Sequence, residues 1–286
     1  MIAFDDVSFS GSDGLRLVGM AAGPSDGAAV LLAHGGGQTH WAWRKTVDAL
    51  AKAGFRATAI DLRGHGGSDR SPSADYHNEA FARDILAVAD QLSGPIQMVG
   101  ASLGGIAGMV AEGVLHPGSF TSLTLVDITP NPNADGVARI NRFMSAHIET
   151  GFASLEEAAE AIGTYTANRE KRAPSDSLSR YLKQGDDGRY RWHWDPAFIA
   201  KFSGVHGEER AQMNDAARAL TLPVHLIRGG SSDLVTASDA ADFLALVPHA
   251  EFTDIKGAGH MVVGDSNDAF SAAIIRFLER HQAVTA

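Results

Sequence analysis

The chain contains no cysteine, and this absence excludes three kinds of chemistry. Without cysteine there is no disulfide framework, no thiolate nucleophile and no cysteine-based zinc site. The zinc-binding pattern H-E-x-x-H is also missing, so we expect no metal centre. The sequence has neither a phosphate-binding G-x-x-x-x-G-K-[ST] loop nor a G-x-G-x-x-G dinucleotide fingerprint. We therefore expect no bound cofactor.

Basic residues are scarce, with 24 Lys and Arg against 34 Asp and Glu, which gives a net charge of −10. An acidic surface repels the phosphates of nucleic acids and the headgroups of anionic membranes. No apolar run is long enough to span a bilayer, and residues 1–6 lack the basic and apolar regions of a secretory signal. The expectation is a cytoplasmic monomer or homodimer with a small-molecule substrate and with no nucleic-acid or membrane partner.

Short, continuous apolar runs alternate with helical patterns along most of the chain. Runs such as Ala29–Ala33 and Ile96–Val99 are typical of central parallel strands that are covered on both faces. This alternation predicts an α/β fold with a mostly parallel sheet and helices on both faces. It breaks from about Pro130 to Ala219, where only helical patterns occur. We therefore predict an α/β core of residues 1–129 and 220–286, and a helical cap of residues 130–219 inserted after the sixth strand.

The stretch Val99–Gly105 contains the pattern G-x-S-x-G between an apolar run and a helical pattern, with Ser102 at its centre. Side chains at Gly100 and Gly104 would collide with neighbouring backbone in so sharp a turn. Such a turn exposes the serine hydroxyl at the C-terminal edge of the sheet. The helix N-terminus beside it offers free N–H groups that can hold an oxyanion. The pattern predicts that Ser102 is a nucleophile.

A serine nucleophile needs a base, and the base needs an acid that orients it. His260 lies in a glycine-flanked loop after the last strand, and Asp233 follows the seventh strand. Both loops reach the same C-terminal edge of the sheet as Ser102. The order Ser102, Asp233, His260 is the triad order of α/β-hydrolases. Asp127, which follows the sixth strand, is the alternative acid.

The loop His34–Gly37 follows a buried strand and is rich in glycine, which lets its backbone approach a substrate oxygen. We expect the N–H groups of Gly36 and Leu103 to form the oxyanion hole, and the His34 side chain to bond its own loop. The expected pocket walls are Gln38, Trp41, Trp192, Trp194 and Met261. This border favours an apolar or aromatic substrate of modest size, although the two cap tryptophans could instead anchor cap helices.

Taken together, these segments resemble the α/β-hydrolase superfamily, and in particular its capped esterases, C–C hydrolases and haloperoxidase-like enzymes. The matching segments are His34–Gly37, Asp61–Asp69, Gly100–Gly105, Ser232–Asp233 and Gly259–His260. The resemblance implies that the Asp61–Asp69 loop shapes the edge of the site without taking part in the chemistry. Relatives that open epoxides or remove halides carry aspartate at the nucleophile position, so Ser102 makes those activities unexpected.

The predicted function is a serine hydrolase of the carboxylic ester hydrolase type, which cleaves an ester, lactone or thioester through an acyl-enzyme. Cleavage of a carbon–carbon bond beside a ketone is an alternative for the same triad. A ligand-binding receptor on a hydrolase fold is another, because a fold alone does not determine function.

Overall fold

The structure is a computed structural model that describes residues 2–165, 178, 181–201, 207–259 and 268–282. His260 and Met261, two of the predicted site residues, lie outside the described residues. No helix among the described residues has the length and apolar character needed to cross a membrane.

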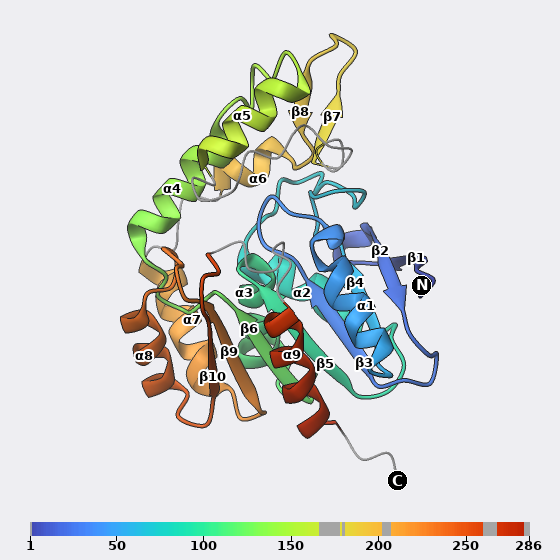
Figure 1. Cartoon of the computed structure of the whole chain (residues 1–286), viewed down its shortest axis with the longest axis vertical. Helices are drawn as coiled ribbons and strands as arrows, with labels where there is room; N and C mark the ends of the chain where they lie inside the picture. The colour runs from blue at the N-terminus through green and yellow to red at the C-terminus, as the bar shows by residue number, and fades with distance from the viewer. Residues whose placement is uncertain (1, 166–177, 179–180, 202–206, 260–267, 283–286) are drawn as a thin grey trace.

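The core of the molecule is an eight-stranded sheet with the order β1-β2-β4-β3-β5-β6-β9-β10 (Figure 1). Its first strands, β1 and β2, form an antiparallel pair, β2 is antiparallel to β4, and the remaining neighbours are parallel. The central strands β3, β5 and β6 are buried along their whole length, as expected for strands covered on both faces. The strand bounds are β1 (Asp5–Ser10), β2 (Arg16–Ala22), β3 (Ala29–Ala33), β4 (Arg56–Ile60), β5 (Ile96–Ala101), β6 (Ser122–Val126), β9 (Val224–Gly229) and β10 (Glu251–Ile255).

Helices cover both faces of the sheet, which confirms the predicted α/β class. On one face, α1 (Arg44–Lys52) and α9 (Asp268–Arg280) bury apolar side chains in a single cluster with alternate residues of the strands. On the other face, a second cluster includes apolar residues of α2 (Asn78–Ala89), α3 (Leu103–Val110) and α8 (Ala237–Leu246). Short helical turns lie at Ser12–Gly14, His40–Trp43 and Ala111–Leu115.

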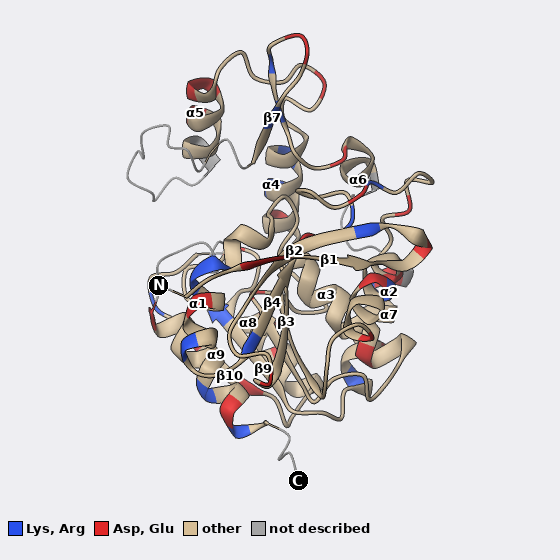
Figure 2. Ribbon diagram, turned by 90° about the vertical axis from the view of Figure 1, so that its right-hand side faces the viewer, with Lys and Arg blue, Asp and Glu red and all other residues tan. Residues whose placement is uncertain are grey.

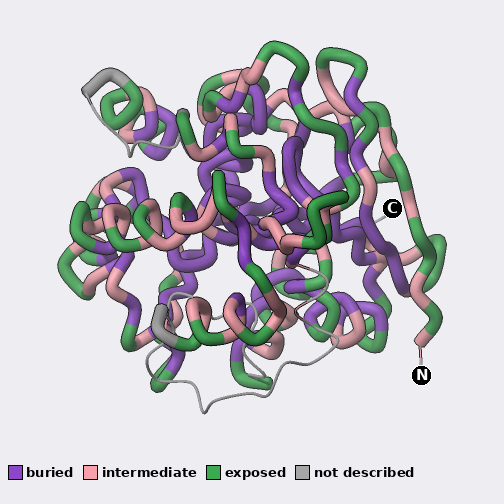
Figure 3. Tube along the Cα trace, turned by 90° about the horizontal axis from the view of Figure 1, so that it is seen from above, coloured by how far each residue is buried: buried purple, intermediate pink, exposed green. Residues whose placement is uncertain are grey.

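Burial and charge follow this layered arrangement. Seen from above, the central strands are buried, and exposed residues follow the outer helices and loops (Figure 3). Acidic and basic residues lie mainly on the helices and loops that surround the sheet (Figure 2). A buried charged side chain loses its hydration and needs a partner, and Arg228, buried in β9, is paired with Asp254.

The chain leaves the sheet after β6 and returns to it at β9. In between lie α4 (Ala134–Ser145), α5 (Leu155–Tyr165), β7 (Leu182–Gln184), β8 (Tyr190–Trp192), α6 (Pro196–Lys201) and α7 (Gly207–Ala219). Figure 1 shows α4, α5, α6 and the antiparallel hairpin β7–β8 grouped above the sheet, and we call these five elements, with the described residues between them, the upper segment. The sequence patterns in this stretch predict only helices, so the hairpin β7–β8 is a feature that the sequence does not predict.

Helix α7, which the sequence groups with the cap, packs beside the sheet against α3, α8 and the turn Ala111–Leu115. Its buried residues Met213 and Ala216 belong to the same apolar cluster as α2 and α3. The part of the insert that stands over the sheet therefore ends before α7.

Candidate active site

Ser102 occupies the single residue between β5 and α3, in a sharp turn with a positive φ of 45°. A Cβ on Gly100 would lie 2.4 Å from the carbonyl oxygen of Gly104, and one on Gly104 would lie 2.4 Å from the carbonyl oxygen of Ala33. Both collisions are the ones that the sequence pattern predicts. The backbone N–H of Ser102 donates to the carbonyl of Val126 at 3.0 Å, which ties the turn to the neighbouring strand β6.

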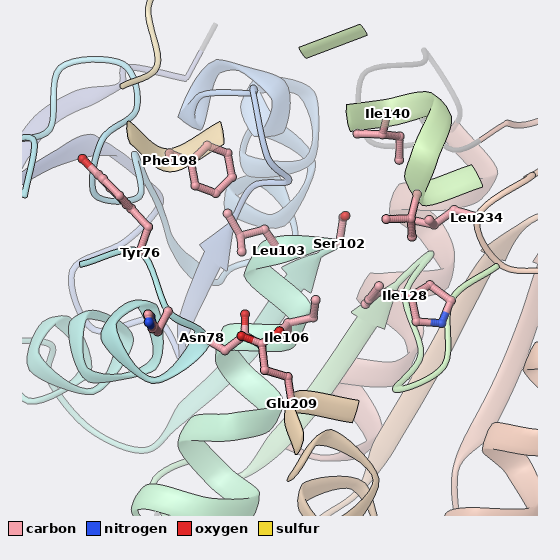
Figure 4. A pocket seen from close by; sticks show the side chains of 13 residues that line it. Tyr76, Asn78, Ser102, Leu103, Ile106, Ile128, Ile140, Phe198, Glu209 and Leu234 are labelled. Atoms are coloured by element: carbon pink, nitrogen blue, oxygen red, sulfur yellow. The ribbon is translucent and has the colours of Figure 1, made fainter. Parts of the chain in front are cut away.

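A pocket lies above this turn and contains Ser102 in its wall (Figure 4). The Ser102 hydroxyl points into the space between Leu103 on one side and Ile140 and Leu234 on the other. Polar groups gather along the part of the wall formed by α7 and the start of α2. The lining residues are Tyr76, His77, Asn78, Ser102, Leu103, Ile106, Ile128, Pro132, Val137, Ile140, Phe198, Glu209 and Leu234. The upper segment thus contributes Val137 and Ile140 from α4 and Phe198 from α6.

Of the two predicted oxyanion donors, Leu103 directly follows Ser102, and Gly36 directly follows Gly35, where an added Cβ would lie 3.3 Å from the Ser102 Cβ. Leu103 is the first residue of α3, where backbone N–H groups have no partner within the helix. Hydrogen bonds between described residues use the N–H groups of Gly35, Gly37 and Gly104, but not those of Gly36 and Leu103. A Cβ added to Gly36 would lie 3.5 Å from the ring of Phe198, which is an ordinary van der Waals contact. These two N–H groups are the ones that remain available for an incoming oxygen.

Two histidines from different parts of the molecule hold the peptide groups of Gly37. The Nε2 atom of His65 accepts the Gly37 N–H at 3.1 Å. The Nδ1 atom of His193 accepts the N–H of Gly66 at 2.8 Å, so its Nε2–H donates to the Gly37 carbonyl at 3.3 Å. Burial lowers the pKa of His193 to about 4, and burial also holds the pKa of His65 well below its usual value. Both rings are therefore neutral at pH 7, as these donor and acceptor roles require.

His34 bonds its own loop, as expected from the sequence. Its Nδ1–H donates to the carbonyl of Gly35 at 2.8 Å, and its Nε2 accepts the N–H of Leu62 at 3.0 Å. Burial lowers the pKa of this imidazole to about 4, so it stays neutral.

Asp61 begins the Asp61–Asp69 loop and joins two loops through its carboxylate. One oxygen accepts from the N–H and ring Nδ1 of His40, and the other accepts from the N–H of Gly67 at 2.8 Å. Burial alone would raise the pKa of Asp61, but the hydrogen bonds and charge of His40 lower it to about 2. These bonds are structural, in agreement with the role that the resemblance implies for this loop.

Asp127 follows β6 directly and lies beside Ser102, because Ala101 and Val126 are paired in the sheet. It is 1% exposed and has a positive φ of 50°. One carboxylate oxygen accepts the N–H of Gly229 at 3.0 Å, and the other accepts the Ser232 hydroxyl at 2.6 Å. A strained, buried carboxylate with aligned donors is typical of a functional site.

Asp233 has different surroundings. Its side chain is 33% exposed and forms an ion pair with Arg139 of α4. A Cβ on Gly136 would lie 2.4 Å from the carbonyl oxygen of Asp233, so α4 also packs closely on its backbone. The carboxylate that the sequence favoured as the triad acid thus joins the upper segment to the loop after β9.

The His260 loop is described up to Gly259, and this part lies against Gly229. A Cβ on Gly229 would be 2.4 Å from the carbonyl oxygen of Gly259. The N–H of Ser231 donates to the carbonyl of Ala258 at 2.8 Å. Gly259, the neighbour of His260 in the chain, therefore packs against the residue whose N–H binds Asp127.

Four of the predicted pocket walls are described, and none of them lines this pocket. Gln38 is buried and accepts the N–H of Gly35, whereas Trp41 is 36% exposed. Trp192 and Trp194 are buried and stack on each other with ring centroids 4.6 Å apart. The Trp192 Nε1–H donates to the carbonyl of Ala146. The two tryptophans thus form an aromatic core within the upper segment, which is the alternative that the sequence left open.

Most of the pocket walls that the sequence does not predict are apolar residues. Val137 and Ile140 are three residues apart on α4, a spacing that places them on one face of a helix. This spacing was a usable signal, but it does not tell which partner the apolar face meets. Phe198 and Leu234 carry no comparable signal.

Comparisons with known proteins agree with this architecture. Residues 28–266 match the family model described as the alpha/beta hydrolase fold. The chain is 28% identical to the esterase Rv0045c of Mycobacterium tuberculosis, over 82% of this chain and 78% of that one. It is 30% identical to 2-(acetamidomethylene)succinate hydrolase of Mesorhizobium japonicum, over 79% of both chains. The crystal structure of an E-2-(acetamidomethylene)succinate hydrolase superposes with a TM-score of 0.82 at 23% identity, covering 97% of this chain and 100% of that chain. The chain therefore belongs to the alpha/beta hydrolase family.

Proposed function

We propose that this protein is a serine hydrolase that cleaves carboxylic esters through an acyl-enzyme on Ser102. The observation that carries the proposal is the Ser102 turn, which has a φ of 45° and directs the hydroxyl into a largely apolar pocket. Similarity to an esterase over most of both chains supports the ester as the bond that is cleaved. The apolar wall around Ser102 supports an uncharged acyl group next to the reacting carbonyl.

In the proposed mechanism, His260 takes the proton of Ser102 while the serine oxygen attacks the ester carbonyl carbon. The backbone N–H groups of Gly36 and Leu103 hold the oxyanion that forms. The intermediate then collapses, the carbon–oxygen bond to the alcohol breaks, and His260 gives its proton to the leaving alcohol. A water molecule, deprotonated by His260, attacks the acyl-enzyme and releases the carboxylic acid and Ser102.

We further propose Asp127, rather than Asp233, as the acid that orients His260. Three observations support this assignment. Asp127 is buried next to Ser102, and its carboxylate is held by Gly229 and Ser232. The described part of the His260 loop packs on Gly229. By contrast, Asp233 is bound to Arg139 and is partly exposed, so water and a cation weaken its influence on an imidazole.

Replacing Ser102 by alanine tests the proposal. Steady-state turnover of p-nitrophenyl butyrate should fall by about 10⁶-fold, the loss expected when a triad nucleophile is removed. The Tm should stay close to that of the wild type, because no core contact is lost. Ser8→Ala, at an exposed position on the edge strand β1, is the matched control and should leave turnover unchanged. Near-wild-type turnover in Ser102→Ala would refute the proposal, and a wild-type protein that releases only one equivalent of p-nitrophenol would be a receptor.

A further inference from the structure

One part of the pocket wall carries a full negative charge that no described side chain neutralises. Glu209, near the start of α7, lines the pocket and is exposed. Among the described residues it forms no hydrogen bond or ion pair. The other lining residues include no Lys or Arg. The Glu209 carboxylate therefore faces the space that a bound substrate would occupy.

The polar groups at the start of α2, which line the same pocket or follow in that helix, do not cancel this charge. Asn78 begins α2 at the same wall, and a helix N-terminus carries about half a positive charge, less than the full charge of a carboxylate. The nearby Arg83 of α2 is shared by two other carboxylates, Asp75 at 3.1 Å and Glu79 at 3.9 Å. His77, also in the wall, lies 3.9 Å from Asp75. These groups of α2 and of the residues before it therefore leave the negative charge of Glu209 uncompensated.

Glu209 and Ser102 face the same space from different elements. Figure 4 shows Glu209 reaching up from α7 toward Ile106, and Ser102 lies beyond Ile106 at the start of α3. An ester bound with its carbonyl at Ser102 can extend its acyl chain along Leu103 and Ile106. The far end of such a chain then approaches the Glu209 carboxylate.

We propose that Glu209 selects the substrate by charge, so that esters with a neutral or cationic distal group are preferred over esters with a distal carboxylate. This inference rests on the proposed ester hydrolysis at Ser102. Two unit charges several ångströms apart near a protein surface change an equilibrium by on the order of tenfold. The preference should therefore be about tenfold against an anionic group, and it should shrink in about 0.5 M salt because salt screens the interaction.

The test uses three p-nitrophenyl esters with similar chains and different distal charges: the 6-methylheptanoate, the hydrogen adipate and the 6-(trimethylammonio)hexanoate. The measured quantity is the ratio of kcat/KM for the neutral ester to kcat/KM for the anionic ester. Glu209→Gln should lower this ratio by about tenfold, and Glu209→Lys should lower it further and disfavour the cationic ester. Asp215→Asn is the matched control, because it removes one negative charge from an exposed position on α7 that lies outside the pocket wall. Its ratio should equal that of the wild type.

A ratio that stays within about twofold of wild type in both Glu209 variants would overturn the inference. Binding of the same esters to Ser102→Ala, measured by calorimetry, separates this failure from a failure of the proposed function. If the wild type hydrolyses none of the esters, the proposed function is wrong. The Kd values of the three esters then still test the inference about Glu209. If Glu209 discriminates by charge, the anionic ester must bind more weakly than the neutral and cationic esters even without turnover.

Discussion

The edge of the sheet and the segment above it build the candidate site in different ways. At the edge, Ser102 and Asp127 follow neighbouring parallel strands, and the pairing of Ala101 with Val126 sets their separation. In the upper segment, Val137 and Ile140 of α4 reach the pocket only because α4 packs across the loop after β9. Backbone hydrogen bonds between paired strands fix the positions of the residues at the sheet edge. The position of a helix that packs on other elements depends instead on every side chain in the contact. Changes at the edge should therefore affect the chemical step, and changes above it should affect stability and substrate choice.

The largest effect should separate the two candidate acids at the sheet edge. Asp127→Asn should lower kcat by about 10⁴-fold, because an amide favours the wrong imidazole tautomer. The substitution is close to isosteric, but the Ser232 hydroxyl oxygen already accepts the N–H groups of Leu234 and Val235, so its hydrogen bond to residue 127 is lost and some stability with it. Circular dichroism checks the fold, and kcat for p-nitrophenyl butyrate measures the loss.

Asp233→Asn is the companion variant, and it should cost no more than a few-fold in kcat. It removes only the partly exposed ion pair with Arg139, and exposed pairs contribute about 0–1 kcal/mol. The opposite ranking of the two variants would assign the acid to Asp233, as the chain order of the triad first indicated.

A second test asks whether the aromatic core of the upper segment touches the substrate. Trp192→Ala should destabilise the protein by about 3–5 kcal/mol, because Trp192 is buried, stacks on Trp194 and meets Phe152 edge to face at 5.0 Å. The ranking of acetyl, butyryl and phenylacetyl esters by kcat/KM should not change, because this ring lies outside the pocket wall. A changed ranking with an unchanged Tm would place the ring against the substrate instead.

Ile140→Ala should cost less stability than Trp192→Ala and, unlike that variant, should change the ranking of the esters. Ile140 lines the pocket and is only partly buried, so its loss should cost little stability. It should lower kcat/KM for the phenylacetyl ester by about tenfold relative to the acetyl ester, since removing part of a hydrophobic wall costs about 1–3 kcal/mol in discrimination. Equal effects on all three esters would show that this face of α4 does not contact the acyl group.

The smallest expected effect concerns how protein stability depends on pH through His193, whose ring links the upper segment to Gly37 and Gly66. Burial holds the pKa of His193 near 4, below its usual 6.5, so the unfolded chain binds the proton more readily than the folded one. Stability should therefore be complete above pH 6.5 and should fall as the pH drops from 6.5 toward 4. Urea unfolding of the wild type and of His193→Leu at several pH values measures this slope. The variant should be less stable at pH 7 and should depend less steeply on pH, whereas identical slopes would exclude His193 as a contributor.

The sequence predicts the elements whose structure is set locally. The strand–helix alternation predicts the sheet. Gly100 predicts the turn at Ser102, because an added Cβ there would meet the carbonyl oxygen of Gly104, a near neighbour in the chain. These predictions needed no knowledge of distant contacts.

The remaining features depend on contacts between residues far apart in the chain. Asp127 and Asp233 both follow strands at the same edge. Burial and the hydrogen bonds from Ser232 and Gly229 set Asp127 apart, and exposure and the ion pair with Arg139 set Asp233 apart. The tryptophans of the upper segment looked suited to a pocket wall, but their large apolar surfaces pack against each other. The strands β7 and β8 have three residues each, too few to produce a recognisable alternation.

Covalent labelling tests the central claim, that Ser102 is the nucleophile, most directly. A fluorophosphonate reacts with an activated serine and leaves a stable phosphonyl ester, which peptide mapping by mass spectrometry assigns to a residue. The prediction is one label per chain, on Ser102, with loss of esterase activity in proportion to labelling and with no label in Ser102→Ala. A label on a different residue that tracks the loss of activity, or full activity in protein labelled at Ser102, would contradict the claim.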